Sequence, residues 1–405
     1  MAKTYAEAGN RGDKVRSDCW TSIQLNSSEG INLNLKSKVK VLYGESIEAL
    51  IHQVLDYYDI KHADVAVEDF GALPYVIMAR LEATVRRLGK DNGKRFLPDW
   101  KYPVQPTTKE RFRRSRLYLP GDQPKLQLNA GVHKADGLIL DLEDSVSPLN
   151  KDTTRVLVRN TLRSLDFMGC ERMVRINQLP MGLEDLEEIV PHKVDVILVP
   201  KVETPEQIQQ IEKKINDIQS ALPKEEQHDT FLMPIIESAL GVVNAYPIAI
   251  ASDLNVGLAI GLEDYTADLG TQRTLAGTES FHARSVLINA ARAAGIQAID
   301  TVFSDVSDME GLETSVKEAK SLGFDGKGCI HPRQIAVIHH AFAPEEKEVE
   351  KAKKIVLAFE KAEKEGKGVV SLGNKMIDPP VVKRALRTID MALQGGILAE
   401  NWREE

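Results

Sequence analysis

Short apolar runs alternate with longer amphipathic segments from about residue 115 onwards. Runs with strand character occur at Ser115–Leu119, Gly137–Leu142, Arg172–Ile176, Val194–Val199, Phe231–Ile236, Val256–Ile260, Gln297–Val302 and Gly326–Ile330. Segments with helical potential separate most of them, including Pro205–Asp217, Phe281–Ala294 and Gly311–Leu322. Strands interleaved with helices in this way predict the α/β class and a parallel (β/α)₈ TIM barrel. A doubly wound sheet is the alternative, because counting strands does not establish closure.

The first 90 residues follow a different pattern and predict a small α+β domain. Residues 31–35 and 65–67 alternate apolar with polar positions, which indicates two strands. Apolar positions over residues 47–58 follow helical spacing, and Ser46 is their predicted N-cap. The apolar run 76–81 fits either a strand or a helix.

A segment rich in proline and charged residues separates the two patterns. No amphipathic period is present over Gly89–Arg111, which predicts an extended linker. A helix-like segment, Glu345–Lys367, follows the last predicted strand. We therefore predict four parts: a small domain (1–90), a linker (91–112), a barrel (113–340) and a C-terminal extension (341–405).

Composition and charge narrow the classes of function. The net charge of −8 gives no electrostatic reason to expect nucleic acid or an anionic membrane as partner. The three cysteines lack C-x-x-C spacing, so neither a disulfide framework nor a zinc site is indicated. The N-terminal segment has no apolar h-region, and no run of about 18 apolar residues occurs, so a cytoplasmic location is expected.

Charged and polar residues follow the predicted strands at the ends where barrel active sites form. They are Asp141, Glu143, Asp144, Arg175, Asn177, Lys201, Glu203, Glu237, Glu263, Asp264, Asp300 and His331. Converging carboxylates repel one another, and a hard divalent cation relieves that repulsion. Glu237 and Asp264 are a good Mg²⁺ pair, while the planar fork of Arg175 suits a carboxylate or a developing enolate oxygen. This combination favours retro-aldol or retro-Claisen cleavage.

Eight motifs of the second unit resemble, in order, those of the citrate lyase beta-subunit and malyl-CoA lyase family, also called the HpcH/HpaI aldolase–citrate lyase family. They are RSRLYLPG (Arg114–Gly121), DGLILDLEDSV (Asp136–Val146), VRIN (Val174–Asn177), VPKVET (Val199–Thr204), IESALGVVNA (Ile236–Ala245), IGLEDYTADLG (Ile260–Gly270), ARAAGIQAID (Ala291–Asp300) and GFDGKGCIHPRQI (Gly323–Ile335). The resemblance implies a Mg²⁺-dependent lyase that cleaves a citryl-type 3-hydroxy-acyl thioester, on a carrier or on CoA, to an acetyl thioester and a 2-oxo acid. A malyl-CoA or citramalyl-CoA lyase with a non-catalytic front domain is the alternative, and a non-catalytic assembly subunit is a third reading.

The same resemblance assigns roles to single residues. It implies that Glu237 and Asp264 bind Mg²⁺ and that Arg175 binds the acid product and stabilises the enolate. Glu143 and Asp144 would not bind the metal directly but would hold water on it.

The resemblance also extends to the end of the chain and to assembly. GNKMIDPPVVKRA (Gly373–Ala385) matches a region from which a late aspartate, here Asp378, enters a neighbouring subunit's site as proton donor or acceptor. A homo-oligomer, trimer or hexamer, is therefore implied, with an alpha-type transferase subunit as a further partner.

The first unit resembles the citrate lyase gamma subunit, which is an acyl carrier protein. The segments RSDCWTSIQL (Arg16–Leu25) and VAVEDFGALPYVIMARLEATVRR (Val65–Arg87) carry this resemblance, together with residues 44–55. In that subunit a serine carries a phosphoribosyl-dephospho-CoA prosthetic group. The carrier has two serines before an aspartate, whereas this chain has Arg16-Ser17-Asp18. The acceptor position falls on Arg16 and its neighbour on Ser17, which is the candidate acceptor here. Without the arm, the front domain would bind free CoA or serve in assembly.

Overall fold

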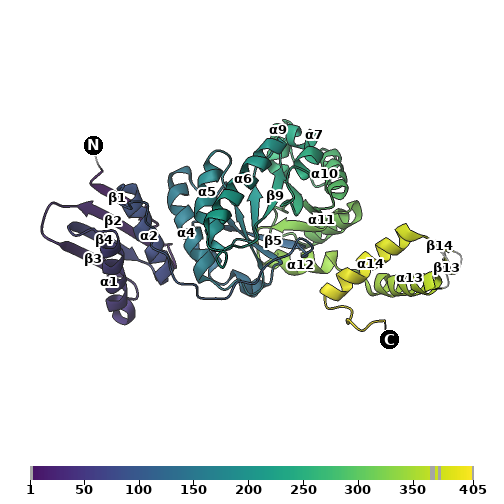
Figure 1. The fold of residues 1–405 in the computed structure, drawn as a ribbon, viewed down its shortest axis with the longest axis horizontal. Helices are drawn as coiled ribbons and strands as arrows, with labels where there is room; N and C mark the ends of the chain where they lie inside the picture. The colour runs from purple at the N-terminus through teal and green to yellow at the C-terminus, as the bar shows by residue number, and fades with distance from the viewer. Residues whose placement is uncertain (1–2, 365–369, 373–374, 404–405) are drawn as a thin grey trace.

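Eight parallel strands close into a barrel at the centre of the molecule (Figure 1). The computed structural model describes residues 3–364, 370–372 and 375–403. The barrel strands are β5 (Ser115–Pro120), β6 (Gly137–Asp141), β7 (Glu171–Arg175), β8 (Val196–Val199), β9 (Phe231–Ile236), β10 (Gly257–Ile260), β11 (Gln297–Asp300) and β12 (Gly326–Cys329). Every predicted strand is present, and β12 pairs with β5, so the barrel prediction is confirmed and the doubly wound alternative is wrong.

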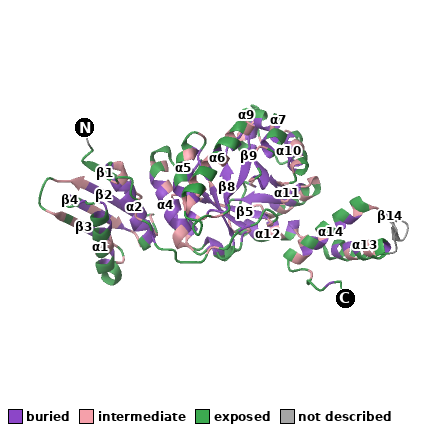
Figure 2. Cartoon of the chain, viewed as in Figure 1, coloured by how far each residue is buried: buried purple, intermediate pink, exposed green. Residues whose placement is uncertain are grey.

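Helices surround the barrel and bury the outward faces of its strands. They are α3 (Pro124–Gln127), α4 (Lys151–Ser164), α5 (Met181–Ile189), α6 (Pro205–Ala221), α7 (Ala239–Val243), α8 (Ala245–Ala249), α9 (Leu262–Asp268), α10 (Phe281–Ala294), α11 (Met309–Leu322) and α12 (Arg333–Phe342). The strands are buried between these helices and the barrel interior, as Figure 2 shows. Burial on both faces explains why the strands are nearly continuous apolar runs in the sequence.

The α6 helix shows how local sequence defines these elements. Thr204 and Gln207 form a capping box at its start, and Pro205 occupies the first turn, where its missing N–H costs nothing. Ile208, Ile211 and Ile215 then recur at helical spacing and are buried against the barrel. Burying each such side chain contributes about 1.5–3 kcal/mol.

The N-terminal part is a four-stranded sheet with two helices. Its elements are β1 (Tyr5–Gly9), β2 (Cys19–Leu25), β3 (Ile31–Ser37), α1 (Lys40–Tyr57), β4 (Ala63–Asp69) and α2 (Pro74–Arg87), with strand order β1-β2-β4-β3. The predicted strands at β3 and β4 are confirmed, and the ambiguous run 76–81 is helical. The predicted N-cap at Ser46 is wrong, because α1 begins six residues earlier, on a turn whose Val41 and Leu42 side chains are exposed. That first turn has no buried face, so the apolar period did not reveal it.

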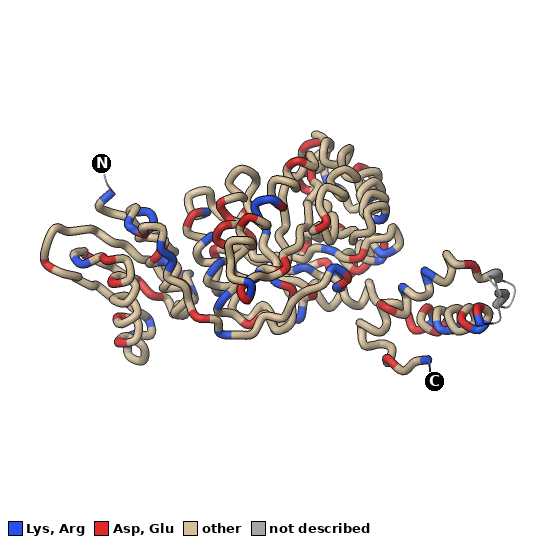
Figure 3. Tube along the Cα trace, in the orientation of Figure 1, with Lys and Arg blue, Asp and Glu red and all other residues tan. Residues whose placement is uncertain are grey.

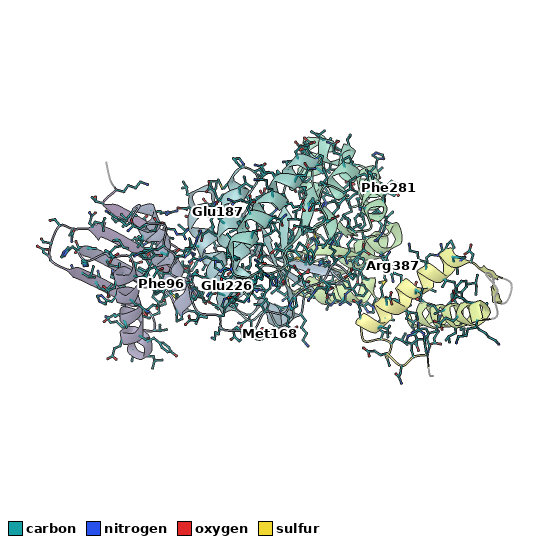
Figure 4. The ribbon with its side chains drawn as sticks, in the orientation of Figure 1. Phe96, Met168, Glu187, Glu226, Phe281 and Arg387 are labelled. Carbon is teal, nitrogen blue, oxygen red and sulfur yellow. The ribbon has the colours of Figure 1, made fainter. Side chains whose placement is uncertain are left out.

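Buried ion pairs join this N-terminal part to the barrel. α2 packs along α4, and Arg159 on α4 donates from Nη1 and Nη2 to the Glu82 carboxylate on α2 at 2.7 and 2.8 Å. The segment 88–114, between α2 and β5, has no helix or strand. Figure 4 places its Phe96 beside the N-terminal part, where its N–H donates to Glu82 Oε2 and Tyr58 Oη.

The chain ends in a helical hairpin on the other side of the barrel (Figure 1). It comprises α13 (Glu346–Lys364), β13 (Val370–Leu372), β14 (Lys375–Ile377) and α14 (Pro379–Gln394). Its two helices share a small apolar core, and Arg387 on α14 forms an ion pair with Asp325, which precedes β12 (Figure 4). Residues 365–367 of the predicted helix and 373–374 of the late-aspartate motif lie outside the described residues.

Acidic and basic side chains are interspersed along all three parts (Figure 3). No helix in the described ranges is both long and apolar enough to cross a lipid bilayer.

Candidate active site

A cavity of about 450 Å³ opens where the barrel strands end. Its lining includes Arg116, Tyr118, Pro120, Asp141, Asp144, Ser145, Arg175, Glu237, Gly261, Asp264, Thr301, Gly328 and Ile330. Arg175, Glu237 and Asp264, which the sequence placed together, therefore face one space. This is the C-terminal face of the strands, where barrel enzymes place their chemistry.

Arg175, the last residue of β7, is held by a bidentate ion pair with Asp141, the last residue of β6. Its Nε and Nη2 donate to Asp141 Oδ1 and Oδ2 at 2.6 and 2.8 Å. Burial opposes charge on both groups, but their mutual hydrogen bonds prevail. They raise the pKa of Arg175 above its usual value and lower that of Asp141 below its own. The guanidinium is therefore fixed and always charged at the cavity wall.

Glu143 and Asp144 approach the third nitrogen of the same guanidinium. Arg175 Nη1 donates to Asp144 Oδ2 at 3.2 Å and lies 2.8 Å from Glu143 Oε2, at an angle that leaves this oxygen without a hydrogen bond. Burial raises the pKa of Glu143 to about 7. Asp144 is half-exposed and lines the cavity. A buried carboxylate with an unsatisfied oxygen is suited to accept a hydrogen bond from bound water.

Glu237 directly follows β9 and is almost fully buried. Its Oε1 accepts the backbone N–H of Lys201 at 2.8 Å, from a residue held in the left-handed region at φ 49°. Its Oε2 lies against Gly261, where a Cβ atom would be 2.4 Å away. Burial raises the pKa of Glu237 to about 8. A carboxylate in this position is ionised at neutral pH only if a cation compensates it.

Asp264 faces Glu237 from the first turn of α9, after β10. Because β10 pairs with β9, the two carboxylates come from adjacent strand–helix connections. Lys201 Nζ lies 3.2 Å from Asp264 Oδ1, so an ammonium group provides the local positive charge. In the described ranges no group of three or more His, Cys, Asp or Glu side chains is arranged to hold a metal ion. Two carboxylates nevertheless fit Mg²⁺, which usually takes one or two from the protein and keeps positions for other oxygens.

The two remaining predicted residues lie away from this cavity. Ser17 precedes β2, has φ 57°, and donates its N–H to Phe70 O at 3.0 Å. Asp378 is the N-cap of α14, and its Oδ1 accepts the Val381 N–H at 3.2 Å. Within one chain, neither residue lines the cavity.

Three residues near the site make contacts that strand-end position alone did not reveal. Asp141 orients Arg175, Gly261 makes room for Glu237, and Lys201 contacts both carboxylates, through its backbone to Glu237 and its side chain to Asp264. The carboxylate of Asp300, another residue at a strand end, instead forms ion pairs with Lys327 and Arg284, between the barrel and α10.

Comparison with known families agrees with this architecture. The model of the HpcH/HpaI aldolase/citrate lyase family matches residues 114–332. That of the C-C bond lyases of the TIM-barrel fold matches residues 274–392. At the N-terminus, the ACP model, described as malonate decarboxylase delta subunit (MdcD), matches residues 10–88.

Two individual relatives and one solved structure are also similar to this chain. Citrate lyase subunit beta of Leuconostoc mesenteroides subsp. cremoris is 43% identical over 285 residues, 70% of this chain and 94% of that protein. Mitochondrial citramalyl-CoA lyase of Homo sapiens is 31% identical over 331 residues, 78% and 92% of the two chains. The crystal structure of CitE from Mycobacterium tuberculosis with magnesium, acetoacetate and coenzyme A aligns with a TM-score of 0.56 and 29% identity. It covers 70% of this chain and 99% of that one.

Proposed function

Because the chain belongs to the HpcH/HpaI aldolase/citrate lyase family, we propose that it is a Mg²⁺-dependent lyase that cleaves a citryl-type 3-hydroxy-acyl thioester. The products are an acetyl thioester and a 2-oxo acid. The observation that carries this proposal is the shared cavity of Glu237, Asp264 and Arg175. Two carboxylates beside a fixed guanidinium suit a reaction that builds negative charge on oxygen.

Glu237 and Asp264 are the proposed Mg²⁺ ligands. Among the described residues Glu237 is buried without an ion-pair partner, and Asp264 forms one ion pair, with the Lys201 ammonium. When bound, Mg²⁺ would supply the positive charge that polarises the substrate's hydroxyl and carboxylate oxygens.

The chain's own residues would direct the bond cleavage. The hydroxyl proton leaves, the carbonyl of the 2-oxo acid forms, and the bond between the α and β carbons breaks. Its electron pair goes to the thioester enolate, which gains a proton at carbon to give the acetyl group. Arg175 would bind the acid and stabilise the enolate, since its Nη1 and Nη2 each keep one N–H beyond those given to Asp141 and Asp144. Glu143 and Asp144 would hold water on the metal.

Asp378 of a neighbouring subunit is the proposed group that takes the hydroxyl proton and returns it to the enolate. The support is its position at the start of α14, on a hairpin that projects from the barrel (Figure 1), and that it does not line the cavity of its own chain. The C-terminal part, residues 341–405, would thus serve a homotrimer or hexamer. An alpha-type transferase remains a proposed partner, and the cytoplasm the proposed compartment.

Ser17 is the proposed attachment point for a phosphoribosyl-dephospho-CoA arm. Its neighbour Asp18 pairs with buried Arg80, and Arg80 Nη2 contacts the carbonyl of Asp122 at 3.4 Å. Asp122 lies two residues beyond β5, whose Pro120 lines the cavity. An acyl group on such an arm would be held near the barrel rim at an effective concentration in the millimolar range. The intact mass of protein from its native host, compared with Ser17→Ala, tests this point.

Cleavage assays on metal-ligand variants test the main proposal. Citryl-CoA and citramalyl-CoA are each offered with increasing Mg²⁺ to the native chain, Asp264→Ala and Glu237→Gln. We expect turnover that requires Mg²⁺ in the native chain and at least about a 100-fold loss in both variants. Glu310→Ala, an exposed acid at the start of α11, is the matched control. Undiminished turnover of Asp264→Ala in excess Mg²⁺ would exclude this metal site.

A further inference from the structure

Arg116 is a buried cation on the inner face of β5, at the inner end of the candidate active site. Alternate residues of β5 point in opposite directions, so Leu117 and Leu119 pack outward against helices while Arg116 and Tyr118 line the cavity. Gly328 on β12 is the direct register partner of Arg116. Gly328 also lines the cavity, and its missing side chain leaves room for Val302 and Tyr118, because a Cβ atom there would lie 2.8 Å from Val302 Cγ1 and 3.4 Å from Tyr118 Cε2.

Arg116 has no carboxylate partner among the described residues. Its Nη1 contacts only Met233 Sδ at 2.9 Å, and its buried Nε makes no hydrogen bond. Glu171 is close enough for its charge to act on Arg116, but its carboxylate already forms a bidentate ion pair with Arg113 and accepts a hydrogen bond from Thr107.

The surroundings of Arg116 make this isolation costly. The barrel interior around Met233 is an apolar cluster that includes Met173, Leu198 and Ile235. A guanidinium is only 1% exposed there, and a buried charge without a counter-ion is strongly unfavourable. Methionine or leucine would fill the same space without this cost. The position therefore indicates an anion that is present only when the cavity is occupied.

We propose that Arg116 binds a second carboxylate of the substrate, on the part that leaves as the 2-oxo acid. This inference rests on the proposed lyase function and deepens it. Arg175 and the two metal-binding carboxylates lie at the mouth, and Tyr118 lies between Arg175 and Arg116, with the Arg175 guanidinium carbon 5.3 Å from its ring centre. The cavity thus has one cationic group at its mouth and another at its inner end. A dicarboxylic 2-oxo acid of the oxaloacetate type satisfies both, whereas pyruvate or glyoxylate leaves Arg116 unpaired.

Substrate discrimination by Arg116 variants tests this assignment. Citryl-CoA and citramalyl-CoA differ at the relevant position by a carboxymethyl group in place of a methyl group. We expect the native chain to prefer citryl-CoA in kcat/KM. Arg116→Met should lower the citryl-to-citramalyl ratio by about 100-fold or more, because only the citryl group loses a buried charged hydrogen bond. Arg116→Lys should recover part of the ratio, since it keeps the charge but not the fork.

Arg172→Met is the matched control. Arg172 is also buried, has no side-chain ion pair among the described residues, and faces away from the cavity toward the carbonyls of Leu162 and His192. Its replacement should change stability without changing the ratio of the two substrates. An unchanged ratio in Arg116→Met, or an equal loss in Arg172→Met, would overturn the proposal.

Ligand-induced thermal shifts separate this inference from the lyase proposal. With Mg²⁺ present, oxaloacetate should raise the Tm of the native chain more than pyruvate does, and this difference should vanish in Arg116→Met. Without ligand, Arg116→Met should melt at the same temperature or higher, because an uncompensated buried charge is gone. If the native chain cleaves no thioester, the lyase proposal fails while the oxaloacetate shift still tests Arg116. If cleavage occurs but Arg116→Met changes neither the citryl-to-citramalyl ratio nor the oxaloacetate-induced shift in Tm, only this inference fails.

Discussion

Gly261 leaves the space that the Glu237 carboxylate occupies: a Cβ atom at position 261 would lie 2.4 Å from Glu237 Oε2 and 3.0 Å from Glu237 Cβ. The φ angle of Gly261 is −108°, which any residue adopts. Its importance is therefore steric rather than conformational. The missing side chain lets a buried acid reach the cavity beside Asp264.

Gly261→Ala should weaken Mg²⁺ binding without unfolding the barrel. The added methyl group would push the Glu237 carboxylate from its place, and changes beside a metal ligand typically cost about 10–100-fold in metal affinity. Isothermal titration with Mg²⁺ measures the effect. Gly44→Ala is the control, because its Cβ would approach only the flexible Lys40 side chain inside α1. There alanine should stabilise the helix by about 0.5–1 kcal/mol. Equal Mg²⁺ affinity in native protein and Gly261→Ala would show that Glu237 is not a ligand.

The pH dependence of Mg²⁺ affinity should follow the ionisation of Glu237. In the metal-free protein its pKa is about 8, above the unfolded value of 4.5, so the folded state holds the extra proton between these values. This group therefore stabilises metal-free protein at low pH, and its contribution declines as pH rises toward 8. Mg²⁺ must displace the proton, so affinity should rise by up to about tenfold per pH unit from pH 6 and level off above pH 8.

Proton release provides the check. Titration calorimetry at pH 6.5 in buffers of different ionisation enthalpy should give close to one proton released per Mg²⁺. Burial raises the pKa of Glu143 as well, so the count is repeated in Glu143→Gln, where the Glu237 proton should persist. A count near zero in that variant would mean that Glu237 is ionised before the metal arrives.

The barrel was predictable because its strands are buried on both faces and charged residues lie at or just after most of their ends, as Asp141 ends β6 and Glu237 follows β9. Closure depends on the β12–β5 pairing, which joins segments over 200 residues apart and leaves no local signal. β1 was missed because its sequence, YAEAG, is rich in alanine and contains no β-branched residue.

Within the site, residue identity was easier to predict than geometry. Glu237, Asp264 and Arg175 share one cavity, as expected from strand-end positions. The Asp141–Arg175 pairing depends on the register of two neighbouring strands, so the sequence showed two strand-end charges but not which partner each takes. Arg116 did leave a signal: it is an arginine near the start of the apolar run SRLYLP, at a depth where neighbouring strands place apolar inward residues such as Met173 and Met233.

Asp141→Asn should reduce turnover through Arg175 rather than through the metal. An asparagine accepts from only one of the two Arg175 nitrogens, so the fork loses its fixed orientation. We expect kcat/KM to fall by about 10–100-fold at unchanged Mg²⁺ affinity. Asp136→Asn, which breaks a similar bidentate pair with Arg114 at the other end of the barrel, should leave turnover unaffected. Similar losses in both variants would assign Asp141 to stability alone.

The Glu82–Arg159 pair should be essential for docking the N-terminal part on the barrel. Both side chains have no exposed surface, and Glu82 also accepts from Phe96 N–H at 2.9 Å. Glu82→Met would leave Arg159 with the Asn160 amide oxygen and, as its one carboxylate among the described residues, Glu188. We therefore expect a loss of about 3–5 kcal/mol in unfolding free energy, measured by urea denaturation. The double variant Glu82→Met/Arg159→Met should recover much of this loss, because paired apolar replacements remove both buried charges. If the single variant unfolds like the native chain, the interface is held by its apolar contacts instead, and the front domain's position near the rim would not depend on this pair.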